Sequence, residues 1–119
     1  MPFDNTTFVA VDEIAIVDRM MELLAEPEGW CKGQLSVTRP SGGQSYCLLG
    51  ALNVVSSGNV MAIPHDKTSR ATLAAMDRES GGIGRYAFVA FNNAPAATHA
   101  DILMFLDAVR SSFIKEGDA

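Results

Sequence analysis

The hydrophobic positions of this chain are densest in its centre, in the nine residues that begin at Cys47. This run holds one polar side chain, Asn53, so a helix here has no polar face wide enough to meet water. Ser45 suits an N-cap, and Gly58 suits a C-terminal stop. A glycine inside a helix costs about 1 kcal/mol relative to alanine, which indicates that Gly50 lets another element pack closely. The pattern predicts a central buried helix from Cys47.

Helical spacing also runs through both ends of the chain. Apolar residues recur every three or four positions from Phe8 to Leu24, and the segment Glu26–Gly29 ends that pattern. Thr98 with Asp101 has the form of a capping box, which opens a second amphipathic helix that is expected to run to Lys115. The two predicted buried stripes are Ile14, Val17, Met21 and Leu24, and then Ile102, Phe105, Leu106, Val109 and Phe113.

The region before the central helix predicts a small β-hairpin. Residues Gln34–Arg39 alternate polar and apolar side chains, as a short half-exposed strand does. Pro40–Gly43 is typical of a turn, and Gln44–Tyr46 would form the returning strand.

The second half of the chain adds shorter segments. Lys67–Arg78 predicts a surface helix, whereas Tyr86–Phe91 fits either a strand or a helix by its pattern. Residues 1–7 and 116–119 are expected to be loose. We therefore predict one compact, mainly α domain over residues 1–119, with a central buried helix, amphipathic N- and C-terminal helices and a possible small hairpin.

Composition narrows the classes of partner. The chain has 119 residues, 48% of them hydrophobic, and a net charge of −5, so it has no electrostatic attraction to phosphate backbones. Direct nucleic-acid binding is disfavoured. No apolar run approaches the roughly 18 residues of a membrane span, and the N-terminus lacks a secretion-signal pattern. We expect a cytoplasmic protein without membrane contact.

The negative charge is concentrated at the start of the chain. Residues 1–29 carry seven acids and one arginine. Glu13, Glu22 and Glu26 are candidates to meet a basic partner protein, and the alternative is that they form an ordinary solvated helix face.

Cysteine and histidine offer the sharpest candidate chemistry. Cys31 and Cys47 are expected to be free thiols, and no spacing of metal-ligand type is present, so we predict neither a metal nor a cofactor. Cys47 at a helix start would feel the positive end of the helix dipole, which lowers a thiol pKa. With His99 or His65 as base and Asn92 or Asn93 as orienting group, it forms a notional catalytic set. The alternative for Cys47 is a buried apolar role.

Aromatic, amide and thioether side chains complete the candidates. Trp30, Tyr46 and Phe91 either fill the core or line a binding surface, where aromatic anchors are favoured. Asn92 and Asn93 fit a turn, because asparagine bonds its own backbone there. The methionines expected to fill the core are Met20, Met21, Met61, Met76 and Met104.

Three motifs together resemble a known family. They are Trp30–Gly33 (Trp-x-x-Gly), Cys47–Leu52 (Cys-Leu-x-Gly-Ala-Leu) and Phe91–Pro95 (an aromatic residue, then Asn-Asp-x-Pro). In this order they resemble a family of small uncharacterised bacterial and phage proteins. The chain departs from the pattern at Phe91, where the family favours tryptophan, and at Asn93, where it favours aspartate. The resemblance implies a mostly helical domain without an assigned activity, and the second departure favours a turn-forming over an acid–base role.

The leading functional hypothesis is a small acidic, non-enzymatic domain that binds another protein. The resemblance implies a phage or mobile-element setting, in which the protein would inhibit a host or defence protein. The alternative is a thiol-dependent hydrolase or transferase that uses Cys47, and a small-molecule sensor built on the aromatics around Trp30 has composition alone in its favour. The sequence leaves the partner and the oligomeric state open.

Overall fold

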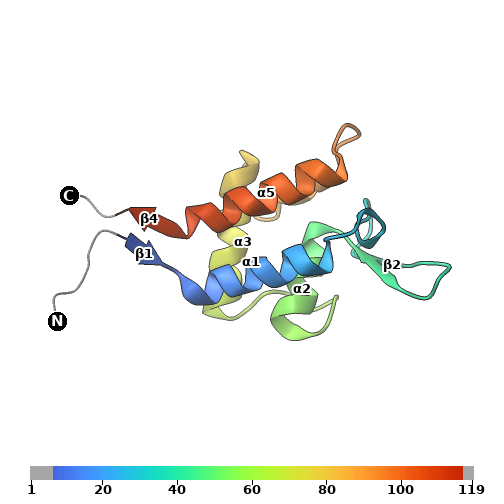
Figure 1. Cartoon of the computed structure of the whole chain (residues 1–119), viewed down its shortest axis with the longest axis horizontal. Coiled ribbons are helices and arrows are strands. Elements are labelled where there is room, and N and C mark those ends of the chain that lie inside the picture. The colour runs from blue at the N-terminus through green and yellow to red at the C-terminus, as the bar shows by residue number, and fades with distance from the viewer. Residues whose placement is uncertain (1–6, 117–119) are drawn as a thin grey trace.

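The computed structural model describes residues 7–116 and places five α-helices and four short strands in that range (Figure 1). The helices are α1 (Val11–Leu23), α2 (Leu48–Ser57), α3 (Lys67–Ser80), α4 (Ala87–Asn93) and α5 (His99–Ser112), with a 3₁₀ turn η1 at Pro27–Gly29. The strands are β1 (Thr7–Val9), β2 (Ser36–Thr38), β3 (Gln44–Tyr46) and β4 (Ile114–Glu116). The predicted mainly α fold is confirmed.

Helices α1 and α5 run antiparallel, and strands β1 and β4 extend them at one end (Figure 1). In the β1–β4 ladder Phe8 lies opposite Lys115. The prediction of helix at both residues was wrong: α1 begins at Val11, and α5 ends at Ser112. The reason is that the two segments meet in space and satisfy their backbone groups by pairing with each other.

Strands β1 and β4 each include one residue of the ends that were expected to be loose, residues 1–7 and 116–119. Thr7 and Glu116 were predicted to be loose and instead pair with each other. Residues 1–6 and 117–119 lie outside the described residues.

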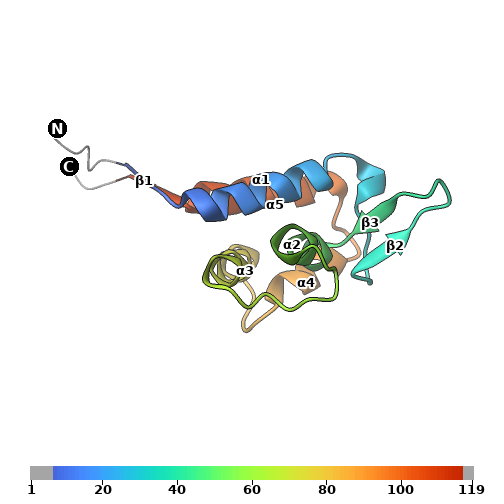
Figure 2. The ribbon, with the colours of Figure 1, turned by 90° about the horizontal axis from the view of Figure 1, so that it is seen from below.

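The core lies between two layers of helices (Figure 2). Helices α1 and α5 form one layer, and α2, α3 and α4 form the other. Each fully buried large apolar side chain favours folding by about 1.5–3 kcal/mol relative to exposure. The fully buried large apolar residues are Val17, Met20 and Leu24, Leu48 and Leu52, Met76, Phe88, and Ile102, Leu106 and Val109.

Helix α2 is the predicted central buried helix, with one correction at its start. Cys47, not Ser45, is the N-cap, and its Sγ accepts a hydrogen bond from the Gly50 N–H at 3.4 Å. Ser45 lies in β3, where its hydroxyl donates to the Glu28 carbonyl. Gly58, with φ of 78°, ends the helix as predicted.

Gly50 has the predicted role of permitting a close approach. A Cβ atom at this position would overlap the backbone carbonyl oxygen of Leu35. The same carbonyl accepts a hydrogen bond from the Cys47 N–H at 3.2 Å. The backbone at Leu35, just before β2, therefore packs directly against the first turn of α2.

The predicted hairpin is confirmed as β2 and β3, which pair antiparallel with Val37 opposite Ser45. The turn is closed by the Arg39 N–H, which donates to the Gly43 carbonyl at 2.7 Å. Beyond the hairpin, the Cys31 N–H donates to the Tyr46 carbonyl at 3.0 Å. This bond attaches the Trp30–Gly33 loop to β3.

Helix α3 begins at Lys67 as predicted, but it is not a surface helix. It packs against α1, α4 and α5, and it buries Thr72 and Met76 completely. The hydrophobic pattern did not predict the burial of α3, because part of its buried face is polar. The Thr72 hydroxyl donates to the Thr68 carbonyl at 2.9 Å, and the Ser69 hydroxyl donates to Asp66, the N-cap, at 2.6 Å. Local hydrogen bonds allow these hydroxyls to be buried at little cost.

The segment Tyr86–Phe91, which fitted either structure, is helical and belongs to α4. Tyr86 is its N-cap with φ of 67°, a left-handed conformation that is rare for a bulky residue. The Asp77 carboxylate holds this start, because it accepts hydrogen bonds from the Tyr86 N–H at 3.0 Å and the Phe88 N–H at 3.3 Å.

The methionines divide into two groups. Met20 and Met76 are fully buried and Met21 is half-buried against the core, whereas Met61 is 71% exposed and Met104 is 70% exposed. The prediction that all five fill the core was therefore wrong for these two. The capping box of Thr98 and Asp101 is confirmed. None of the helices in residues 7–116 is long and apolar enough to cross a membrane.

Candidate functional site

The three motifs noted in the sequence meet at Asn92, at the end of α4. Its side chain is 1% exposed and uses both its oxygen and its nitrogen. Oδ1 accepts from Trp30 Nε1 at 2.8 Å and from the Leu48 N–H at 3.0 Å. Nδ2 donates to the Cys31 carbonyl at 3.2 Å and to Asn93 Oδ1 at 2.8 Å. Because the first two partners can only donate, they fix the orientation of the amide.

This Asn92 junction, which comprises Trp30, Cys31, Leu48, Asn92 and Asn93, corrects the expected local turn role of Asn92. Its hydrogen bonds reach residues more than 40 positions away, apart from the bond to Asn93. Asn93 is exposed, and its Oδ1 also accepts from the Gly33 N–H at 2.8 Å. The junction holds the Trp30–Gly33 loop, the start of α2 and the end of α4 together.

Lys32 and Tyr46 lie beside the junction. Lys32 Nζ donates to the Ala94 carbonyl at 2.7 Å and lies 5.5 Å from the centre of the Trp30 ring. Tyr46 is half-buried and bridges to Trp30 through the backbone. The Lys32 contact joins the Trp30–Gly33 loop to the end of α4, and the Tyr46 bridge joins the same loop to β3. These contacts support a structural role for the junction.

Neither cysteine is activated as a nucleophile. Both are free thiols, and Cys47 is only 4% exposed. Burial raises the pKa of Cys47, and the backbone hydrogen bonds from Gly50 and Leu49 that act in the opposite direction are the smaller influence. The expectation that the helix start would lower this pKa was therefore wrong. Burial, with a smaller contribution from nearby Cys47, raises the pKa of Cys31 to about 11.

The histidines are engaged elsewhere. His99 Nε2 lies 2.6 Å from the Leu24 carbonyl oxygen, and its ring centre is 6.4 Å from that of Trp30. The His99 side chain is half-buried. His65 is exposed, with Nδ1 3.2 Å from the Ile63 carbonyl oxygen. Within residues 7–116, no hydrogen bond links Cys47 to either histidine or to Asn92, so the thiol has no base.

We expect alkylation by iodoacetamide to reflect these raised pKa values. A Cys47→Ser variant isolates Cys31. Burial, the larger cause of its raised pKa, remains in this variant, so the Cys31 thiolate should still form well above the ordinary 9.0. At pH 8 labelling should be more than about tenfold slower than in urea, because each unit of raised pKa lowers the thiolate fraction tenfold. In the wild-type chain the Cys31 thiol loses its proton at a lower pH when the protein is unfolded than when it is folded. The contribution of Cys31 to the free energy of unfolding should therefore be lost as the pH rises from 9 to 11.

The complementary Cys31→Ser variant isolates Cys47 and should also label slowly. Rapid labelling of Cys47 at neutral pH in the folded protein would contradict the unreactive thiol and restore the enzyme hypothesis.

The acidic candidates do not gather at the junction or on one side of α1. Glu22 and Glu26 are exposed and Glu13 is half-buried. Glu13 and Glu22 are nine positions apart, which is about two and a half helical turns and puts them on opposite sides of the helix. Asp18 between them pairs with Arg110 of α5 at 2.7 Å. An interface that used all three glutamates would have to wrap around α1.

A groove between α3, α4 and α5 contains another of the predicted binding residues, Phe91. The Phe91 ring stacks on Phe105, with ring centres 4.8 Å apart and an angle of 28° between their planes. The groove has a volume of about 340 Å³, and Met104 stands beside the stacked rings with 70% of its surface exposed. The residues that line it are Glu79, Phe91, Asp101, Met104, Phe105 and Ala108. Its lining combines apolar side chains with the two acidic residues Glu79 and Asp101.

Three groove residues could have been found from the sequence. Asp101, Met104 and Ala108 recur at the spacing of one helix face, and this face lies beside the predicted buried stripe of α5. Sequence reasoning instead assigned Met104 to the core because methionine usually packs there. Glu79 gave no such signal, since its place depends on how α3 crosses α5.

The family of unknown function DUF6197 matches residues 10–112. A match over this extent shows that the chain belongs to that family, which confirms the expected resemblance at the level of a family without an assigned function. No match was found among curated proteins or among solved structures.

Proposed function

We propose that this member of the DUF6197 family is a non-enzymatic domain that binds a basic segment of another protein in the groove between α3, α4 and α5. The observation that carries the proposal is the exposed Met104 beside the Phe91–Phe105 stack, with two acidic residues in the same lining. A large apolar side chain left in water at a concave site is typical of a binding surface.

The shape of the groove favours one apolar side chain of the partner as the anchor. Its volume of about 340 Å³ is at the lower end of ligand sites, which span about 300–1,000 Å³. Met104 can adapt to an inserted side chain because its thioether is flexible and polarisable. The aromatic stack behind it provides a flat apolar wall.

The charge of the groove favours basic residues next to that anchor. Glu79 is exposed on α3, and Asp101 is half-buried at the start of α5. Asp101 Oδ2 accepts from the Thr98 N–H at 2.9 Å, which leaves Oδ1 without a hydrogen bond among the described residues. Complementary charge speeds association and selects the partner, and the net charge of −5 acts in the same direction over longer distances.

Inhibition of a host or defence protein is the finer form of this proposal, and the resemblance seen in the sequence motivates it. A catalytic role for Cys47 has less support, because its thiol is buried and lacks a base.

A Met104→Lys variant should lose partner capture. Lysine would put a positive charge where a basic segment is expected and remove the apolar anchor site, so affinity should fall about tenfold or more, as at interface hot spots. Met61→Lys is a matched control, since Met61 is equally exposed and does not line the groove. The measurement is affinity capture from source-cell lysate with mass spectrometry, followed by titration of the captured protein.

Each result of this comparison decides the proposal. A protein retained by wild type and Met61→Lys but lost by Met104→Lys supports the groove. Equal capture by all three, or no specific capture at micromolar bait, overturns it. A triple variant, Glu13→Lys with Glu22→Lys and Glu26→Lys, tests the acidic residues of α1 and of the segment that follows it. Loss of capture by this variant alone would place the interface at those residues.

A further inference from the structure

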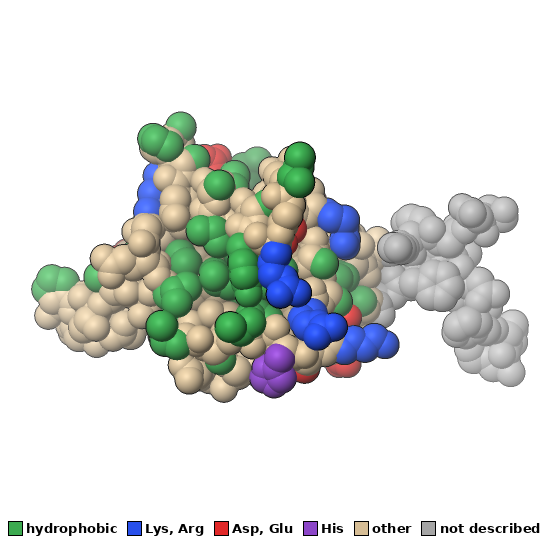
Figure 3. Space-filling view, turned by 180° about the vertical axis from the view of Figure 1, so that it is seen from behind, with side chains coloured by type: hydrophobic (Ala, Val, Ile, Leu, Met, Phe, Trp, Pro, Cys, Tyr) green, Lys and Arg blue, Asp and Glu red, His purple; other side chains and the backbone are tan. Residues whose placement is uncertain are grey.

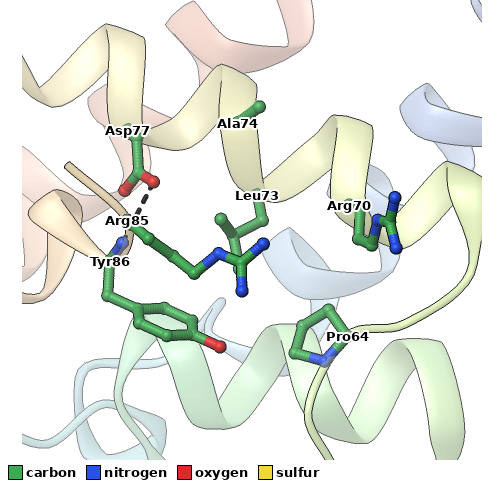
Figure 4. A pocket seen from close by; sticks show the side chains of 7 residues that line it. All are labelled: Pro64, Arg70, Leu73, Ala74, Asp77, Arg85 and Tyr86. Carbon is green, nitrogen blue, oxygen red and sulfur yellow. Dashed lines mark hydrogen bonds between the residues drawn. The ribbon is translucent and has the colours of Figure 1, made fainter.

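A second pocket lies on the face that α2, α3 and α4 present, away from the α5 groove. Figure 3 shows hydrophobic side chains at the centre of this face and, beginning beside them, a row of Lys and Arg side chains. The pocket has a volume of about 170 Å³. It is lined by Pro64, Arg70, Leu73, Ala74, Asp77, Arg85 and Tyr86 (Figure 4).

The pocket combines an apolar floor with two guanidinium groups. Leu73 is 7% exposed and Pro64 is buried. Figure 4 shows the Arg85 guanidinium beside Leu73, between the Tyr86 ring and the side where Arg70 and Pro64 lie. Among residues 7–116, neither arginine forms an ion pair, and the single pair there is Arg110 with Asp18.

The carboxylate of Asp77, in the pocket wall, already accepts hydrogen bonds from the backbone. Asp77 accepts the backbone N–H groups of Tyr86 and Phe88, at 3.0 and 3.3 Å. It thereby fixes the left-handed backbone of Tyr86, and this conformation sets the position of the ring at the pocket. The three charges leave a local formal charge of +1 in a chain that carries −5 overall.

We propose that this pocket binds a small organic oxyanion, a carboxylate or a phosphate monoester, with its head at Arg70 and Arg85 and its apolar part against Pro64, Leu73 and Tyr86. Guanidinium groups bind such heads through paired N–H···O hydrogen bonds. The volume of about 170 Å³ limits the ligand to a compact body such as a single ring.

The test is an NMR titration of the ¹⁵N-labelled protein at constant ionic strength. The probes are phenyl phosphate and benzoate, which have both parts of the ligand, and inorganic phosphate and phenol, which have one part each. We expect saturable shifts at Ala74, Arg85 and Tyr86 with a two-part probe, and binding at least about fivefold weaker for each one-part probe. The stronger of phenyl phosphate and benzoate identifies the head group.

Arginine variants assign the site. Arg85→Gln and Arg70→Gln should each weaken binding of the better probe about fivefold, a modest factor because both side chains are exposed. Arg78→Gln removes the same charge from an exposed position of α3 that does not line the pocket, and it should leave binding unchanged. Equal weakening by all three variants, or shifts that do not saturate at millimolar probe, would overturn the proposal. All three variants change only exposed side chains and so should fold.

Discussion

An Asn92→Ala variant should lose about 3 kcal/mol of unfolding free energy, because each buried polar group left unpaired costs about 1–3 kcal/mol. The substitution removes both acceptor bonds and both donor bonds of the amide at once. Trp30 Nε1 and the Leu48 N–H would keep their polarity and lose their partner. Water cannot easily replace the amide, since Asn92 is 1% exposed.

Urea unfolding, followed by fluorescence of the single tryptophan Trp30, measures this loss. The control is Gln34→Ala, which removes an exposed amide that forms no side-chain hydrogen bond among the described residues and should cost less than about 1 kcal/mol. Asn92→Asp adds a sharper test: it keeps the size but places a carboxylate oxygen against the Cys31 carbonyl and Asn93 Oδ1. If Asn92→Ala is no less stable than Gln34→Ala, the junction does not hold the fold together.

The second large effect is expected at Gly50. Alanine there would favour the helix by about 1 kcal/mol, yet its Cβ would overlap the Leu35 carbonyl, which is backbone and cannot rotate away. Overpacking of this kind costs about 1–3 kcal/mol and more when backbone must move. We expect a net loss of about 2 kcal/mol in unfolding free energy, together with NMR shifts at Leu35 and at Cys47, whose N–H bonds to that carbonyl.

Gly81→Ala is the matched control for Gly50→Ala. Gly81 ends α3 with φ of 74° and has open space around its Cβ position, so alanine there should cost about 1 kcal/mol from backbone strain. The two variants therefore separate a packing clash from a conformational cost. Gly50→Ala as stable as wild type, with unshifted Leu35, would show that the hairpin is not seated on α2.

The elements that the sequence predicts well are those specified by neighbouring residues. The α5 capping box depends on two residues three positions apart, and the stop at Gly58 depends on one glycine. Both were correct. The predicted N-cap of α2 was wrong by two residues, since Ser45 and Cys47 can both cap a helix and Ser45 instead lies in strand β3. The neighbouring residues do not distinguish these two N-caps, and the pairing of β3 with β2 decides between them.

The features that the sequence could not predict depend on contacts between residues that are far apart in the sequence. Asn92 looked like a turn residue because its neighbours Ala94 and Pro95 end a helix, while its main partner Trp30 is 62 positions away. The Arg70–Arg85 pocket likewise joins a helix to a loop in a geometry that no spacing encodes. Phe91 was a predicted binding residue, and its place in the α5 groove follows only from the packing of α4 on the rest.

The β1–β4 ladder closes a loop that spans nearly all of the described chain, because Thr7 pairs with Glu116. The entropy lost in closing a loop grows with its length, by about 0.6 kcal/mol per doubling, and two strands of three residues recover little of it. Packing of α1 against α5 brings these segments within reach before they pair. The ladder therefore depends on the helical core for its existence, and the core does not depend on the ladder.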